Sequence, residues 1–246
     1  MKLNPLFLIC IIPLLIFSCS GPEKTKEENA APVKKDSLVS AADTFHVGTK
    51  IFYVEQISKA DFDNAPGPFQ PDSLEKNILI RDSIYAFRLG SVLILNMNGR
   101  FEETISFKDN TKEGTEGFCQ FTYKGFLPEI NQYVVFGAFV ESFNYFLIDK
   151  ATADTSFACG FPIMSPGKKH FICGNTDLMA RFVPNGFDLY EVVGKKIHLV
   201  GRRELDKWGP EKIKWLNDSS LLVQRNVLDT TSPGMIKTDY VKLLMN

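Results

Sequence analysis

The feature that most constrains this chain is the succession of short aromatic and β-branched runs that fills it from Thr44 onward. These runs, rich in Phe, Tyr, Val and Ile, alternate with turns rich in Gly, Asn, Asp and Pro; examples are residues 49–58, 91–107 and 187–201. The 3.6-residue spacing of amphipathic helices is scarce. The pattern therefore predicts an all-β domain over residues 44–246, built as a sandwich, a barrel or a propeller.

Internal similarity favours the propeller. Three segments each reach a proline, pass through a short strand, turn and return; they are residues 125–136, 160–172 and 208–223. A second hairpin follows the first two, at residues 144–160 and 188–201, so that each unit holds four strands. Residues 77–87 with 91–107 fit the same form, with Asn98-Gly99 as a hairpin turn. The only helix that we expect is a turn around Asp72–Lys76.

The last unit supplies three strands, at residues 211–216, 220–225 and 235–244. The strand at residues 50–57 has no unit of its own, and it would fill the vacant fourth place. We therefore predict a small propeller-like domain of about four blades, in which the N-terminal strand closes the ring and hides the sheet edges. A twisted two-sheet β-sandwich is the alternative.

One of these hairpins carries a recognisable motif. The segment "FPIMSPGKKHFI" resembles the strand–turn–strand core of TolB-type propeller repeats, with Ser165, Pro166, Gly167 and Lys168 in place and the aspartate of that pattern missing. With residues 208–223 it also resembles uncharacterised Bacteroidota lipoproteins. The resemblance covers residues 44–246, and it implies a fold without implying an activity.

The first 18 residues have the pattern of an export signal. Lys2 precedes the apolar run at residues 6–17, which is shorter than the roughly 20 residues of a membrane-spanning helix and contains Pro13. Residues 16–19, "IFSC", resemble the lipobox of bacterial lipoproteins. The resemblance implies cleavage between Ser18 and Cys19 and a lipid on the Cys19 sulfur. A plain secretory signal is the alternative.

Residues 19–43 are expected to form a lipidated, disordered tether. Residues 20–43 contain no aromatic side chain and mix lysine with glutamate, so they bury too little apolar surface to order themselves. Several acyl chains on one cysteine would hold the protein stably at a bilayer. We expect an exported protein anchored in the bacterial cell envelope, and the Bacteroidota resemblance favours the outer membrane.

The composition indicates no nucleic-acid partner, because 28 basic and 29 acidic residues are nearly balanced and form no basic stripe. Motifs for hydrolase nucleophiles, phosphate loops and zinc sites are missing, so we expect no cofactor and no catalytic residue. A non-enzymatic binding scaffold with an envelope protein or glycan as partner is therefore the leading hypothesis. A surface hydrolase or lyase acting on carbohydrate or peptide is the alternative.

Several single residues could carry chemistry. A weak ion-binding loop is indicated at residues 109–118, where Asp109, Glu113 and Glu116 surround two glycines; a solvated loop is the alternative. The three histidines are expected to face solvent from strands. Cys159 and Cys173 flank a hairpin and would either form a disulfide or remain small buried thiols. Cys119 is expected to be a small buried thiol as well. Candidate hydrolase carboxylates lack a constraining context; they are Glu129, Glu141 and Asp149.

Overall fold

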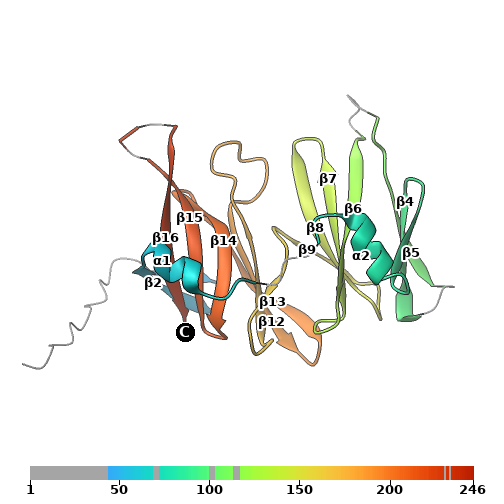
Figure 1. Ribbon diagram of the computed structural model, residues 1–246, viewed down its shortest axis with the longest axis horizontal. Helices are drawn as coiled ribbons and strands as arrows, with labels where there is room; N and C mark the ends of the chain where they lie inside the picture. The colour runs from blue at the N-terminus through green and yellow to red at the C-terminus, as the bar shows by residue number, and fades with distance from the viewer. Residues whose placement is uncertain (1–43, 69–71, 100–102, 113–116, 230, 233) are drawn as a thin grey trace, which may run out of the picture. The chain divides into compact units, whose positions relative to one another are not determined.

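The structure is a computed structural model that describes residues 44–246 except 69–71, 100–102, 113–116, 230 and 233 (Figure 1). The described residues form four antiparallel sheets, and none of these sheets closes into a barrel. The predicted all-β class is confirmed, with four sheets in place of the two of a sandwich. The predicted signal and tether, with Ser18 and Cys19, lie outside the described residues.

The terminal sheet joins the two ends of the domain in the order β1-β2-β16-β15-β14. In it, β2 pairs with β16 in a register that places Phe52 opposite Met245 and Gln56 opposite Val241. The predicted pairing of the N-terminal strand with the last unit is therefore confirmed. The strands of this sheet are β1 (Thr44–Val47), β2 (Lys50–Gln56), β14 (Trp208–Asn217), β15 (Ser220–Leu228) and β16 (Ile236–Met245).

The other three sheets each come from one continuous stretch of chain and follow chain order. The first contains β3 (Ala86–Leu89), β4 (Val92–Asn96) and β5 (Thr104–Lys108), with the 3₁₀ turn η1 (Met97–Gly99) after β4. The second contains β6 (Cys119–Leu127), β7 (Gln132–Phe139), β8 (Ser142–Asp149) and β9 (Thr155–Ala158). The third contains β10 (Ile163–Met164), β11 (His170–Asn175), β12 (Gly186–Val193) and β13 (Lys196–Glu204).

The start of the domain differs from the sequence prediction. Two short helices precede β3, namely α1 (Lys59–Asn64) and α2 (Glu75–Arg81), and α2 occupies the stretch expected to be a strand. In a strand Ile78 and Ile80 would share one face. Instead Ile78 is 1% exposed and Ile80 is 66% exposed, as a helix places them. The hairpin expected at Asn98-Gly99 is present, because β4 pairs with β5.

Three clusters of buried side chains lie between successive sheets. The first joins the β3–β5 and β6–β9 sheets, the second joins the β6–β9 and β10–β13 sheets, and the third joins the β10–β13 and terminal sheets. None of these clusters of described residues joins the terminal sheet to the β3–β5 sheet, as a closed ring of four blades requires. The propeller ring therefore stays a prediction. Large members of the three clusters are Tyr123 and Tyr133, Phe171 and Tyr190, and Phe52 and Phe187.

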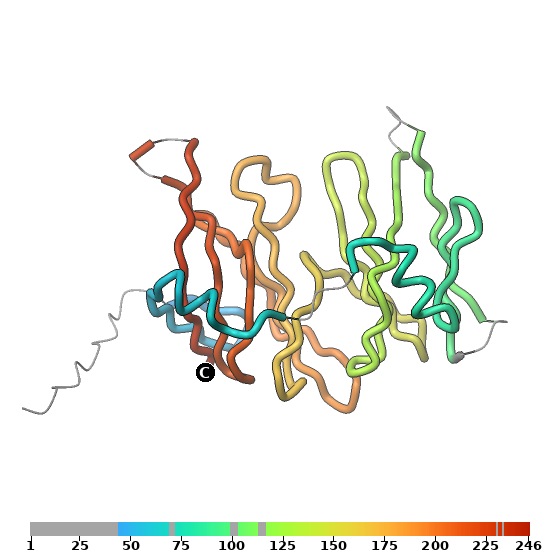
Figure 2. Tube along the Cα trace, in the orientation of Figure 1, coloured from blue at the N-terminus to red at the C-terminus, as the bar shows by residue number. Residues whose placement is uncertain are grey.

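The segment containing α1 and α2 connects the two ends of this series of sheets. Helix α1 contacts β15 and β16 of the terminal sheet, whereas α2 contacts β6 and β3 (Figure 2). The Lys214 ammonium group caps the end of α1 by donating to the carbonyl oxygens of Phe62 and Ala65, at 2.8 and 2.9 Å. After β2 the chain therefore leaves the terminal sheet, forms α1 against that sheet and α2 against β6, and then enters the β3–β5 sheet.

Carboxylates close the open edge of β6. A strand at a sheet edge leaves every second backbone N–H without a strand partner. In β6 three such N–H groups donate to side-chain carboxylates from other elements, so that this edge is satisfied without a further strand. The pairs are Phe121 with Asp109 at 2.8 Å, Tyr123 with Glu75 at 2.6 Å, and Phe126 with Asp82 at 3.3 Å.

Arg88 holds two of these carboxylates in place. Its guanidinium donates twice to Glu75 at 2.9 Å, once to Asp109 at 2.9 Å, and once to the Phe121 carbonyl oxygen at 2.6 Å. The Arg88 side chain is only 19% exposed. A partly buried guanidinium with this many charged partners fixes the β3–β5 sheet and α2 against β6.

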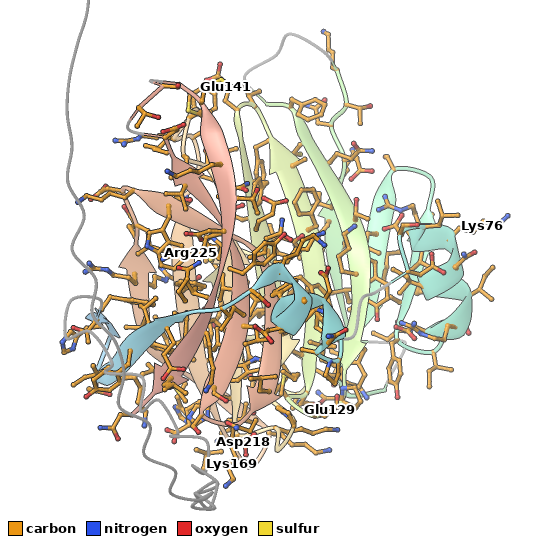
Figure 3. The ribbon with its side chains drawn as sticks, turned by 60° about the vertical axis from the view of Figure 1, so that its left-hand side comes forward. Lys76, Glu129, Glu141, Lys169, Asp218 and Arg225 are labelled. Atoms are coloured by element: carbon orange, nitrogen blue, oxygen red, sulfur yellow. The ribbon has the colours of Figure 1, made fainter. Side chains whose placement is uncertain are left out.

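The turns at one end of the sheets are also linked by polar contacts. Asp218, in the β14–β15 turn, accepts the Gly167 N–H at 2.7 Å, and Lys168 donates to Glu129 in the β6–β7 turn at 2.6 Å. Figure 3 shows Glu129, Lys169 and Asp218 at this end. A Cβ atom at Gly167 would lie 2.1 Å from a carboxylate oxygen of Asp218, so a larger residue there would displace the Asp218 side chain.

We predict that Arg88→Met lowers the free energy of unfolding by about 3–5 kcal/mol, because it leaves two largely buried carboxylates without their cation. Urea denaturation followed by tryptophan fluorescence measures this change. Arg203→Met is the control, since Arg203 is exposed and its removal is expected to change stability by about 0.5 kcal/mol or less. Equal effects of the two substitutions would show that Arg88 does not hold the edge.

Candidate functional site

A cleft of about 630 Å³ lies where the edge strands β6, β10 and β14 meet the α1–α2 segment. This volume falls within the range of about 300–1,000 Å³ that is usual for small-molecule sites. We call it the inner cleft. It is lined by Gly67, Pro68, Asp72, Ser73, Lys124, Tyr145, Phe161, Ile163, Gly174, Pro210, Glu211, Lys212, Ile213 and Lys214.

The apolar part of the inner cleft is formed by Tyr145, Phe161 and Ile163. The rings of Tyr145 and Phe161 meet edge to face with their centroids 6.4 Å apart. Trp215 fixes this wall by donating its indole N–H to the Ile163 carbonyl oxygen at 2.8 Å. Burial raises the pKa of Tyr145, so its hydroxyl stays protonated and able to donate.

Two β-bulges direct charged side chains into the inner cleft. In β6 the register with β7 shifts between Tyr123 and Gly125, which leaves Lys124 as the extra residue. In β14 the register with β15 shifts between Pro210 and Lys212, which leaves Glu211 as the extra residue. Bulges commonly re-aim a side chain beside a binding site. Both extra residues here line the cleft, from two different sheets.

Three of the five charged side chains of the inner cleft have partners within the protein. Hydrogen bonds to Asp72, first from the Leu74 backbone N–H and then from Asn77, lower the pKa of this carboxyl group. Glu211 accepts from the Asn226 amide at 2.9 Å. The third is Lys214, whose ammonium group caps α1.

The other two charged side chains are lysines without such partners. Among the described residues, neither Lys124 nor Lys212 makes a hydrogen bond or an ion pair. The Lys124 ammonium lies 5.6 Å from the centroid of the Phe136 ring, and its side chain is half-buried. Lys212 is exposed, and its charge contributes, after the hydrogen bond from Lys59, to lowering the pKa of Asp63. With three lysines and two carboxylates among its lining residues, the inner cleft has a net positive charge.

The predicted ion-binding loop is described only in part. Asp109 has both carboxylate oxygens occupied, one by Arg88 at 2.9 Å and the other by the Phe121 N–H at 2.8 Å. Glu113 and Glu116 lie outside the described residues. Across the described part of the chain, no group of three or more His, Cys, Asp or Glu is arranged to hold a metal ion. An ion at residues 109–118 stays a prediction.

The histidines lie away from the inner cleft. His46 and His198 are exposed strand residues, as predicted. His170 is half-buried, and its Nδ1 atom is buried without a hydrogen-bond partner in the described structure. Burial, followed by the charge of Lys50, lowers the pKa of His170, so it is neutral at pH 7. The prediction that all three face solvent is therefore wrong for His170.

The candidate hydrolase carboxylates do not form a pair. Glu129 is in an ion pair with Lys168, whereas Glu141 lies at the opposite end of the molecule (Figure 3). Asp149 accepts the backbone N–H groups of Ala151 and Thr152, at 2.7 and 3.1 Å, and so stabilises the turn after β8. These three carboxylates have structural partners or face solvent.

Sequence reasoning missed the residues of the inner cleft. Lys124, Tyr145, Phe161 and Lys212 come from four separate stretches of chain; three of them lie in ordinary strands, and Phe161 lies between β9 and β10. The interruption of β14 by Pro210 is the one local sign, because proline inside a sheet usually marks an edge or a bulge.

Comparisons with known proteins give no family: no family model, no curated protein and no solved structure matches the chain. Among the helices that the structure describes, none has the length and apolar character that crossing a membrane requires.

The thiols give a direct prediction. Cys119, Cys159 and Cys173 are free, and burial raises the pKa of both Cys159 and Cys173. Because the thiolate is the reactive form, these two should resist iodoacetamide in the folded protein at about pH 8 and react after unfolding without reductant. Peptide mapping by mass spectrometry reads each site, with the partly exposed Cys119 as the internal control. A Cys159–Cys173 disulfide would instead leave both unlabelled after unfolding.

Proposed function

We propose that this protein is a lipid-anchored cell-envelope protein that binds a ligand in the inner cleft. The supporting observation is the composition of the cleft, which combines an apolar wall with two lysine ammonium groups that make no hydrogen bond or ion pair within the described residues. Ligand sites typically combine an apolar lining with a few polar groups in this way.

The anchor is a lipid on Cys19, followed by the tether. The lipobox resemblance at residues 16–19 supports this part of the proposal. As a flexible coil, residues 20–43 would span about 27 Å root-mean-square, enough to hold the domain clear of lipid headgroups. The tether thereby lets the inner cleft meet ligands outside the bilayer, with the outer membrane as the preferred location.

Binding is favoured over hydrolysis or lyase chemistry by the state of the acidic residues. General acid catalysis on glycosides needs a carboxyl group with a raised pKa. The Asp72 carboxyl has a lowered pKa, and Glu211 is held by Asn226. The lining residues include neither histidine nor cysteine. A surface hydrolase or lyase acting on carbohydrate or peptide is the alternative function. It requires a catalytic acid or nucleophile other than Asp72 and Glu211.

We predict that Cys19→Ala abolishes incorporation of labelled palmitate and releases the protein from the membrane fraction, because the sulfur that carries the lipid is lost. Cys10→Ala is the matched control and should leave both unchanged, since Cys10 lies within the signal. Persistent labelling of the Cys19→Ala protein would refute the lipobox interpretation.

A photo-crosslinking experiment tests the cleft. Ser73 is an exposed lining residue, so p-benzoylphenylalanine at this position should form a discrete adduct when cells are irradiated. The same substitution at the exposed Lys196, on β13, should form none. An absence of adducts at Ser73, or the same adducts at both positions, would contradict ligand binding in the inner cleft.

A further inference from the structure

We infer that the inner cleft binds an acidic oligosaccharide, whose uronate carboxylates pair with Lys124 and Lys212 while a sugar ring packs on Tyr145 and Phe161. This inference rests on the proposed function and specifies its ligand. Three observations support it. Lys124 and Lys212 make no hydrogen bond or ion pair within the described residues, β6 and β14 each have a bulge beside the cleft, and the strand edges around the cleft are short or interrupted.

The charge balance selects an anion. Five charged side chains line the cleft, and both carboxylates among them already accept hydrogen bonds from the protein. The ammonium groups of Lys124 and Lys212 each retain three donors, and these form stronger hydrogen bonds with an ionised acceptor than with a neutral one. A ligand with carboxylates satisfies them, and the lining as a whole carries three lysines against two carboxylates.

The two lysines come from different sheets. Lys124 is the bulge residue of β6, and Lys212 follows the bulge residue of β14. The Lys124 side chain is half-buried and makes no ion pair among the described residues, and its ammonium lies 5.6 Å from the centroid of the Phe136 ring. A ligand that pairs with each lysine separately needs more than one acidic group, so repeated carboxylates along a short chain fit better than one isolated anion.

The apolar wall of the inner cleft suits a sugar ring. The Tyr145 and Phe161 side chains present apolar surface to the cleft, and Gly174, which also lines it, adds no side chain. The Tyr145 hydroxyl has no hydrogen-bond partner among the described residues, although its raised pKa keeps it a donor. Sugars combine apolar C–H faces with hydroxyl acceptors and therefore match both features.

An acidic peptide is disfavoured by the strand edges. An extended peptide binds by adding to a continuous edge. Here β10 contains only Ile163–Met164, and β14 is interrupted by Pro210, which has no N–H, and by the bulge at Glu211. On β6, three edge N–H groups are already bonded to carboxylates. No long edge is therefore left for main-chain pairing.

The test is calorimetric titration of the full-length protein in detergent with trigalacturonic acid. Lys124→Gln and Lys212→Gln should each weaken binding by about tenfold or more, because each removes a charge-assisted contact. Lys196→Gln, which removes an exposed lysine elsewhere, should leave the affinity unchanged. Maltotriose, a neutral trisaccharide, should bind weakly or not at all, and unchanged circular dichroism confirms that each variant folds.

Each other outcome overturns a defined part of the proposal. Unchanged affinity in both cleft variants would refute the lysine contacts. Lysine-dependent binding of hexaglutamate in place of trigalacturonic acid would replace the glycan by an acidic peptide. If none of these probes binds while the Ser73 crosslink persists, the acidic-glycan inference fails and the binding function stands. If the crosslink is absent as well, both fail.

Discussion

This structure depends on hydrogen-bond partners for the backbone N–H and C=O groups at the edges of its sheets. Each antiparallel sheet ends in strands whose outward backbone groups need partners or solvent. The protein covers one edge with the N-terminal strand β2 and closes another, on β6, with three carboxylates held partly by Arg88. The inner cleft lies where the edge strands β10 and β14 are not paired with a further strand, so the candidate site is located by how the edges are arranged.

The charged side chains also differ between the β6 edge and the inner cleft. Acidic side chains around β6 accept from backbone N–H groups and from Arg88, and those of the cleft accept from Asn226, Asn77 and the Leu74 backbone. In the cleft, Lys124 is the bulge residue of β6, and Lys212 follows the bulge residue of β14. A nearly neutral chain thus acquires a locally positive site without a basic surface.

Much of the fold follows from local patterns, and the site does not. Alternation and turn residues predict the strands of the terminal sheet, and the surplus strand at residues 50–57 predicts its pairing with β16. The helical turn expected around Asp72–Lys76 overlaps only the start of α2, and the rest of α2 is predicted as a strand because its short apolar run also fits one. Arg88 and Asp109 are 21 residues apart, and the cleft lysines lie on different sheets, so only long-range packing brings these groups together.

Amide hydrogen exchange of β6 tests the account most directly. The account predicts that the N–H groups of Phe121, Tyr123 and Phe126 are protected as strongly as the N–H groups that β6 donates to β7, because carboxylates replace the missing strand. If these three exchange as fast as the amides of exposed turns, then the edge of β6 is open. The division between closed and open edges, and with it the placement of the site, would then be wrong.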